Sequence, residues 1–195
     1  FGEYNINASR VNGSTNDAVR LLKSVNGGAT WSEVTRWNTD GSNNNIRHIH
    51  AVKQGPNGRI YVVTGDTDAQ SAIYSWDGVS AWPVNINPAS TVQTDSLKAL
   101  FGRQAFRTID LIFKDGWMYT LPDAETGQPS TNHESGMWRV SQDMDISTLE
   151  RVSTVTTNQA FMAGWLADVL PTGELVWLGG NANPQSGQKY NPIIV

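Results

Sequence analysis

The sequence predicts an all-β protein built from repeated antiparallel units of four strands. Three observations lead to this prediction. Charged residues make up only 16% of the chain, against about 25% in an average soluble domain, and Asn, Ser, Thr, Gln and Gly supply most of its polarity. Short apolar runs alternate with turn signals such as Asn-Gly and Asp-Gly, which favour β-hairpins. The same order of runs and turns recurs along the chain.

Two strands joined by a tight turn open each repeat. The expected first strands span residues 46–52, 106–112 and 161–167, and the expected second strands span 60–63, 117–120 and 175–178. The turns between them are 55–58, 114–116 and 171–173, and each contains a glycine that can take the positive φ of a hairpin turn. Residues 1–4 have the pattern of the second strand of a preceding copy.

Two further strands complete each repeat. Third strands are expected at 19–24, 72–75, 136–141 and 189–194, and fourth strands at 31–34, 82–84 and 149–152. Ser24 and Ser141 hold equivalent places two repeats apart, which gives a repeat of about 58 residues. Residues 97–101 fall in a connection between repeats, where we expect one helical turn.

Repeats of four antiparallel strands are typical of β-propeller blades, which radiate about an axis with their first strands around a central channel. The chain then holds about three and a half blades, with approximate limits 1–40, 41–95, 96–155 and 156–195. A closed ring needs at least about four blades. We therefore expect a piece of a larger ring, whose strand edges pack against further blades of the same polypeptide or against another chain.

Charge and composition exclude several classes of function. The formal net charge of −4 argues against a nucleic-acid partner, because phosphate binding needs clustered basic surface. No apolar run approaches the roughly 20 residues of a membrane-spanning helix, so we expect no membrane partner. The chain has no cysteine, which rules out disulfides, thiolate catalysis and cysteine-bound zinc. We expect no cofactor.

One turn carries a recognisable motif. Residues 24–31 read Ser-Val-Asn-Gly-Gly-Ala-Thr-Trp and resemble the Asp-box, Ser-x-Asp-x-Gly-x-Thr-Trp, with Asn26 in the place of Asp. A short polar side chain at this position bonds backbone N–H groups of its own turn, and we expect Trp31 to tuck back under the hairpin. A weaker copy stands at 75–82 and a remnant at 141–143. The motif is expected to be structural rather than catalytic.

On these turns and their spacing, the chain resembles the sialidase-like β-propellers with Asp-box (BNR) repeats over essentially its whole length. Residues 47–50, 64–66, 102–107 and 123–124 are similar to segments of a bacterial or phage sialidase-like group of largely unassigned activity. The resemblance implies a carbohydrate-active module that is extracellular, on a cell surface or on a virion. True sialidases carry an Arg-Ile-Pro motif and three carboxylate-binding arginines. This chain has no Arg-Ile-Pro, and Met162 stands where two other repeats have Arg.

In a propeller, the start of the first strand and the end of the second strand of each blade face one mouth of the ring. The candidate site residues come from these places. The expected catalytic residues are Asp66, Asp123 and His50. The expected substrate-binding residues are Arg47, Arg107, His48, Asp68, Asp110 and His133. The arginines suit carboxylate or sulfate groups, because a guanidinium binds two such oxygens at once.

Each of these residues also has a structural interpretation. Arg47 and Arg107 recur at equivalent positions and could bond carbonyls of a neighbouring blade. The acidic residues could cap their loops. His48 and His50 are two apart on one strand and share a face, so they could chelate a metal. We expect a hydrogen-bonded histidine pair instead, and no metal.

Two functions from different classes remain open. The first is an enzyme acting on an anionic glycan: a glycoside hydrolase with two carboxylates, or, as the less favoured enzyme, a lyase with a histidine base and an arginine that neutralises a uronate. The second is a non-catalytic glycan-binding or structural propeller of a phage tail or cell surface. The low charge and the missing Arg-Ile-Pro favour the second function, and the resemblance favours the first.

Overall fold

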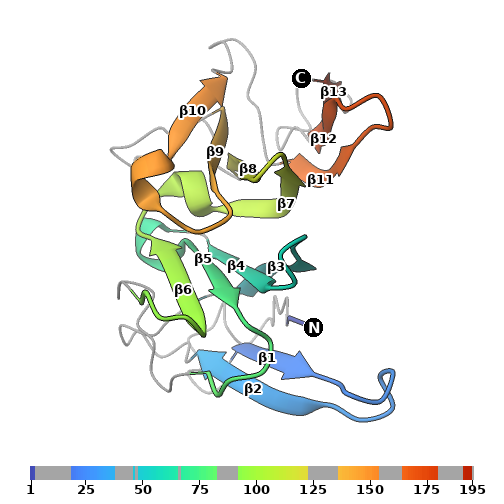
Figure 1. Cartoon of the computed structure of the whole chain (residues 1–195), viewed down its shortest axis with the longest axis vertical. Coiled ribbons are helices and arrows are strands. Elements are labelled where there is room, and N and C mark those ends of the chain that lie inside the picture. The colour runs from blue at the N-terminus through green and yellow to red at the C-terminus, as the bar shows by residue number, and fades with distance from the viewer. Residues whose placement is uncertain are drawn as a thin grey trace, which may run out of the picture.

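The structure is a computed structural model, and it describes residues 1–2, 19–37, 46, 48–65, 67–82, 92–122, 136–153, 164–179 and 191–194. These residues form four antiparallel sheets and three short 3-10 helices, with no α-helix among them. The chain is therefore all-β, as the sequence predicts. Figure 1 shows the first sheet at the bottom of the molecule, the second above it, and the third and fourth at the top.

Each sheet consists of strands that follow one another in the chain. The first sheet contains β1 (Val19–Lys23) and β2 (Ser32–Trp37). The second contains β3 (His48–Gln54), β4 (Ile60–Gly65), β5 (Ala72–Trp76) and β6 (Leu97–Phe101). The third contains β7 (Thr108–Lys114), β8 (Trp117–Pro122), β9 (Met137–Ser141) and β10 (Glu150–Ser153). The fourth contains β11 (Gly164–Val169), β12 (Leu175–Gly179) and β13 (Asn191–Ile194).

Tight turns explain why consecutive strands pair. Between β7 and β8, Asp115 and Gly116 have φ angles of 51° and 81°. Two successive residues with positive φ are what a two-residue hairpin requires. Lys114 and Trp117 pair directly across this turn. The hairpin predicted from Asp-Gly is therefore confirmed.

Residues 97–101 form strand β6 and not the helical turn that we expected. β6 pairs with β5 along its whole length and completes the second sheet. Leu97 and Ala99 point into the core shared with the first sheet, whereas Leu100 points into the core shared with the third. This alternation has the period of two that a strand requires. Of the fourth strand expected at 82–84, only Trp82 is described, and it belongs to no strand.

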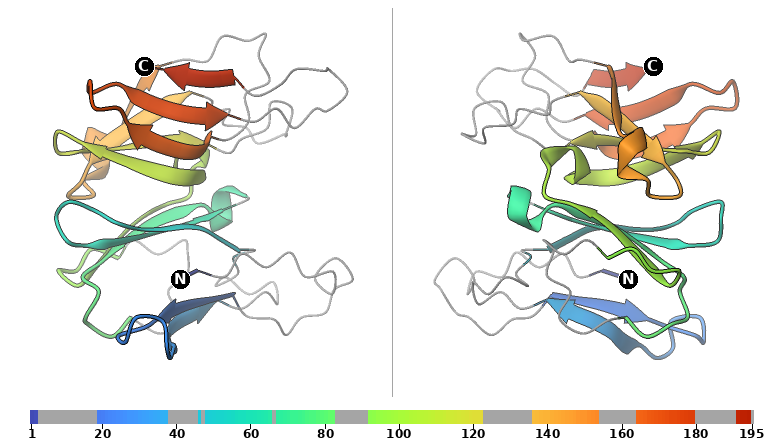
Figure 2. Two further views of the ribbon diagram at one scale, coloured as in Figure 1. Left: turned by 90° about the vertical axis from the view of Figure 1, so that its right-hand side faces the viewer. Right: turned by 60° about the vertical axis from the view of Figure 1, so that its left-hand side comes forward.

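The sheets stack on one another through three hydrophobic clusters. The first cluster joins the first and second sheets around Trp37 and Tyr74. The second joins the second and third sheets around Tyr61 and Leu111, and the third joins the third and fourth sheets around Leu175. The first strands β3, β7 and β11 lie side by side, as Figure 2 shows. The described part of the chain is thus an open stack of meanders in which the expected first strands are neighbours.

The short helices lie in the connections between strands. They are η1 (Asp68–Gln70), η2 (Gln104–Phe106) and η3 (Ile146–Thr148). η2 explains why the third sheet starts at Thr108, two residues later than we predicted. Its residues are buried. In the sequence, the apolar Ala105 and Phe106 therefore look like the start of the following strand.

Lysine side chains connect successive sheets. Each of the four lysines in the described part of the chain donates to a backbone carbonyl of the next sheet or of a turn attached to it. The pairs are Lys23 with Gly78 at 2.7 Å, Lys53 with Leu111 at 2.7 Å, Lys98 with Asp143 at 2.9 Å and Lys114 with Gly173 at 2.6 Å. A compact ammonium on a flexible stem suits this bridging between layers.

Candidate functional site

The first strands of the last three sheets each carry an irregularity near their start. The pairing register shifts around His50 in β3, around Ile109 and Asp110 in β7, and around Trp165 in β11. His50, Asp110 and Trp165 are the residues that the repeat alignment makes equivalent. A β-bulge turns a side chain away from the regular ladder. The same position of the first strand is therefore irregular in three sheets, and a different residue occupies it in each.

His48 and His50 contact each other through their imidazole rings. Their Nε2 atoms are 2.7 Å apart, and the stacked rings have centroids 4.6 Å apart. Nδ1 of His50 lies 3.0 Å from the carbonyl oxygen of Thr108 in β7. Because a carbonyl only accepts, Nδ1 of His50 carries a proton, and in the neutral ring its Nε2 is an acceptor. Nε2 of His48 then donates to it, so the two form the hydrogen-bonded pair that we expected.

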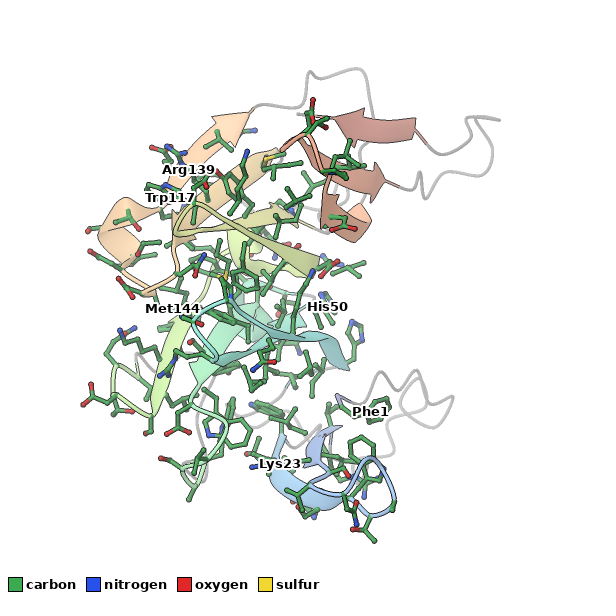
Figure 3. The ribbon with its side chains drawn as sticks, turned by 45° about the vertical axis from the view of Figure 1, so that its right-hand side comes forward. Phe1, Lys23, His50, Trp117, Arg139 and Met144 are labelled. Atoms are coloured by element: carbon green, nitrogen blue, oxygen red, sulfur yellow. The ribbon has the colours of Figure 1, made fainter. Side chains whose placement is uncertain are left out.

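His50 and Arg107 meet at Gly65, the last residue of β4. A Cβ atom on Gly65 would lie 2.8 Å from Cγ of Arg107 and 2.9 Å from Cε1 of His50. Carbon atoms do not approach so closely, so Gly65 is required for space and not for its φ angle. In Figure 3, His50 lies where the second sheet meets the third, on the side of the molecule opposite Met144. The structure thus brings together one expected catalytic residue and one expected binding residue.

Asp68 bonds to a residue that the sequence did not single out. The side-chain amide of Gln104 donates to Oδ1 of Asp68 at 2.6 Å, and Gln104 is buried. Asp68 is the first residue of η1, and the side chain of Thr67 before it makes no capping hydrogen bond. The carboxylate therefore ties the connection after β4 to the connection before β7. The apolar residues Ala105 and Phe106, which directly follow Gln104, are the sequence signal that could have pointed to a buried residue here.

Asp110 acts as a junction between three sheets. Its Oδ1 accepts from Lys53 Nζ at 3.0 Å and from the N–H of Leu111 at 2.8 Å. Its Oδ2 accepts from the N–H of Ala167 in β11 at 2.9 Å. Both carboxylate oxygens are therefore engaged by the protein, which supports a structural role beside the binding role expected from sequence.

Four candidate residues lie outside the described residues. They are Arg47, Asp66, Asp123 and His133. In the sequence, Arg47 directly precedes β3, Asp66 directly follows β4 and Asp123 directly follows β8. Gly65, which positions its neighbours, was also absent from the sequence-based candidates. A glycine at the end of the strand-like run 60–64 is the signal of close approach that points to it.

The turn at 24–31 follows the bonding expected of an Asp-box, with Asn26 in place of Asp. Oδ1 of Asn26 accepts from the N–H of Thr30 at 2.9 Å, and Oγ of Ser24 accepts from the N–H of Gly28 at 2.8 Å. The Trp31 ring folds back against its own turn, since a Cβ atom on Gly28 would lie 3.7 Å from Cζ2 of Trp31, but the residue remains 52% exposed. It lies edge-on to Phe1 and lines a hollow of about 450 Å³ between the first two sheets instead of a packed core.

The second copy of the motif is built differently. Oδ1 of Asp77 accepts from the N–H groups of Val79 and Ser80, both at 2.8 Å. The Ser80 hydroxyl donates to the other carboxylate oxygen, and this bond is the main reason that the pKa of Asp77 is held below its ordinary value. Trp82 is buried against the rings of Trp37, Tyr74 and Trp76. The tryptophan that staples the core is therefore that of the weaker copy.

Two hollows lie away from the candidate residues. The first is the hollow beneath Trp31. The second has a volume of about 460 Å³ and lies between the β3–β4 and β7–β8 turns, beside Asn57 and Asp115. Neither is lined by His48, His50, Asp68, Arg107 or Asp110.

Among the residues that the structure describes, no group of three or more His, Cys, Asp and Glu side chains is placed to hold a metal ion. Over the same residues, no helix has the length and apolar character needed to cross a membrane. Comparison of the chain with protein-family models, with curated proteins and with solved structures gives no match.

Proposed function

We propose that this chain is part of a β-propeller that binds an acidic glycan where His50 and Arg107 meet. Successive meanders of four strands, with their first strands side by side, support the propeller, because this is how blades are arranged. The observation that carries the binding proposal is the close packing of these two side chains against Gly65.

The chemistry of the site favours an anion on an otherwise neutral ligand. A guanidinium binds both oxygens of a carboxylate or sulfate, and Nε2 of the His50 imidazole can bond a ligand hydroxyl or acid in place of His48. The chain carries a net charge of −4 and few charged residues. Its surface as a whole therefore does not attract a densely charged polyanion. A sugar polymer with single acidic groups fits this balance better than a polyphosphate.

Binding is tested with immobilised acidic and neutral glycans and purified chain variants. Arg107→Ala should weaken binding to acidic glycans by about tenfold or more, the equivalent of losing one charge-assisted contact. The matched control is Arg36→Ala, which removes an arginine whose side chain is 58% exposed in β2 and should leave binding unchanged. If Arg107→Ala binds acidic glycans as well as the unmodified chain, the site is not the one proposed.

Turnover is the second candidate function, and the packing of His50 and Arg107 against the same glycine favours it. A histidine base beside a guanidinium that neutralises a uronate is an arrangement for β-elimination, whereas hydrolysis would use the carboxylates Asp66 and Asp123. Product analysis on the same glycans separates the possibilities. Unsaturated uronates indicate elimination, shortened saturated chains indicate hydrolysis, and binding without products leaves a non-catalytic module.

The propeller proposal also makes a statement about association. We propose that the chain packs against further blades of the same polypeptide or another chain, in a protein located outside the cell, on a cell surface or on a virion. A blade covers its flat faces only with neighbouring blades. Size measurement and thermal unfolding of the isolated 195 residues test this: a monomer with one sharp transition would contradict it.

A further inference from the structure

The contact between His48 and His50 has the features of a preformed pair of metal ligands. We infer that the two Nε2 atoms bind a divalent late transition metal ion such as Cu²⁺, Ni²⁺ or Zn²⁺. This inference goes beyond the proposed glycan site and does not depend on it. It starts from the 2.7 Å separation of two nitrogen atoms that come from one strand and lie at the same spot.

The first argument is the orientation of His50. Histidines that bind metals through one nitrogen usually donate the other N–H to a carboxylate or a backbone carbonyl, which fixes the tautomer. Nδ1 of His50 does this with the Thr108 carbonyl at 3.0 Å. Since Thr108 belongs to the neighbouring sheet, the ring is held by the stacking of the sheets, and its Nε2 lone pair is directed to His48.

The second argument is that little movement is needed. With metal–nitrogen bonds of about 2.0–2.1 Å, two nitrogens are about 2.9 Å apart at an angle of 90° and about 3.3 Å apart at a tetrahedral angle. The observed separation is 2.7 Å, and His48 is only 4% exposed. The rings thus have to part by a few tenths of an ångström and turn so that both Nε2 lone pairs converge on the ion. His48, which donates from Nε2 in the metal-free pair, then carries its proton on Nδ1.

The third argument concerns the choice of ion. Imidazole nitrogens suit Cu, Ni and Zn, whereas Ca²⁺ and Mg²⁺ prefer oxygen. The narrow separation is closest to the right angle of square-planar and octahedral sites, which favours Cu²⁺ and Ni²⁺ over tetrahedral Zn²⁺. No third His, Cys, Asp or Glu joins the pair within the described residues, so water or ligands from elsewhere complete the coordination. We therefore expect one ion per chain, with Cu²⁺ bound most tightly.

The test uses the metal chlorides alone, added to the full chain without glycan. The chain has three histidines, His48, His50 and His133, and each is replaced singly by Gln. We expect one equivalent of Cu²⁺ to bind, with an electron paramagnetic resonance spectrum split by two equivalent nitrogens, and CaCl₂ to give no binding. His48→Gln and His50→Gln should each weaken Cu²⁺ binding by at least about tenfold, whereas His133→Gln should not change the two-nitrogen signature.

Circular dichroism and unfolding of each variant without metal show whether it is folded. A folded His50→Gln variant that binds Cu²⁺ as the unmodified chain does would overturn the inference. So would loss of the two-nitrogen signature in His133→Gln alone, because the metal would then lie elsewhere. Arg107→Ala should weaken acidic-glycan binding by about tenfold or more and leave Cu²⁺ binding intact, so failure of the metal site and failure of the proposed function give different results.

Discussion

Replacing Asp110 should weaken the connection between the three sheets that its carboxylate joins. Asp110→Ala removes hydrogen bonds from Lys53, Leu111 and Ala167 at 3.0, 2.8 and 2.9 Å. A hydrogen bond to a charged group contributes about 1.5–3 kcal/mol. The side chains of Lys53 and Asp110 are 37% and 18% exposed, so water replaces part of each bond, and we take about 1 kcal/mol per bond. The free energy of unfolding should fall by about 3 kcal/mol.

Urea unfolding followed by tryptophan fluorescence measures this change. Asp110→Asn keeps one acceptor oxygen and should lose about 1–2 kcal/mol, between the unmodified chain and the alanine variant. Asp168→Ala is the matched control, because Asp168 is exposed and its carboxylate bonds the N–H of its own neighbour Val169. That variant should change stability by no more than about 0.5 kcal/mol. Equal unfolding midpoints for Asp110→Ala and Asp168→Ala would refute the reasoning.

Three further predictions follow from the site and the turns. Gly65→Ala should cost about 1–3 kcal/mol through overpacking and weaken acidic-glycan binding, because Arg107 must move; unchanged stability and binding would contradict it. Trp82→Ala should destabilise the chain by about 3–5 kcal/mol, and Trp31→Ala by less than about 1 kcal/mol. A lower urea midpoint for Trp31→Ala than for Trp82→Ala would show that the exposed tryptophan contributes more to stability. Because the pKa of Asp77 in the folded chain lies below its ordinary value of 3.8, its carboxylate contributes fully to the free energy of unfolding when the pH is above 3.8. That contribution is lost as the pH falls through the lower folded value. The stability of Asp77→Asn should therefore depend less steeply on pH below 3.8. Identical acid-unfolding curves for this variant and the unmodified chain would show that Asp77 does not contribute.

Local patterns predicted the strands whose pairing is decided locally. The hairpin at Asp115 and Gly116 is such a case, because two residues with positive φ fix both the turn and the register. β6 was missed for the opposite reason. Its residues Leu97 to Phe101 have good helix propensity, and their partner β5 ends at Trp76, well before β6 begins at Leu97. Only the cores on both sides of the sheet make this segment a strand.

The candidate site shows the same division. The propeller interpretation placed His50 and Arg107 near each other, because both lie at the starts of first strands and these strands are neighbours. It did not identify Gln104, whose bond to Asp68 depends on the path of η2. It also treated Trp31 and Trp82 as equivalent, although one is 52% exposed and the other 5%. Burial is set by the neighbouring sheet, which a repeat pattern does not contain.

The lysine bridges between sheets have a consequence for chemical modification. Acylation of a lysine removes its charge and its capacity to form an ion pair. Each described lysine donates to the next sheet, so amine reagents should react faster as the layers part, and the modified lysines should then prevent the layers from closing. Cyanate, which forms in aged urea solutions and carbamylates lysine, would make unfolding irreversible one layer at a time. The extent of labelling at Lys23, Lys53, Lys98 and Lys114 would therefore record which layers have opened.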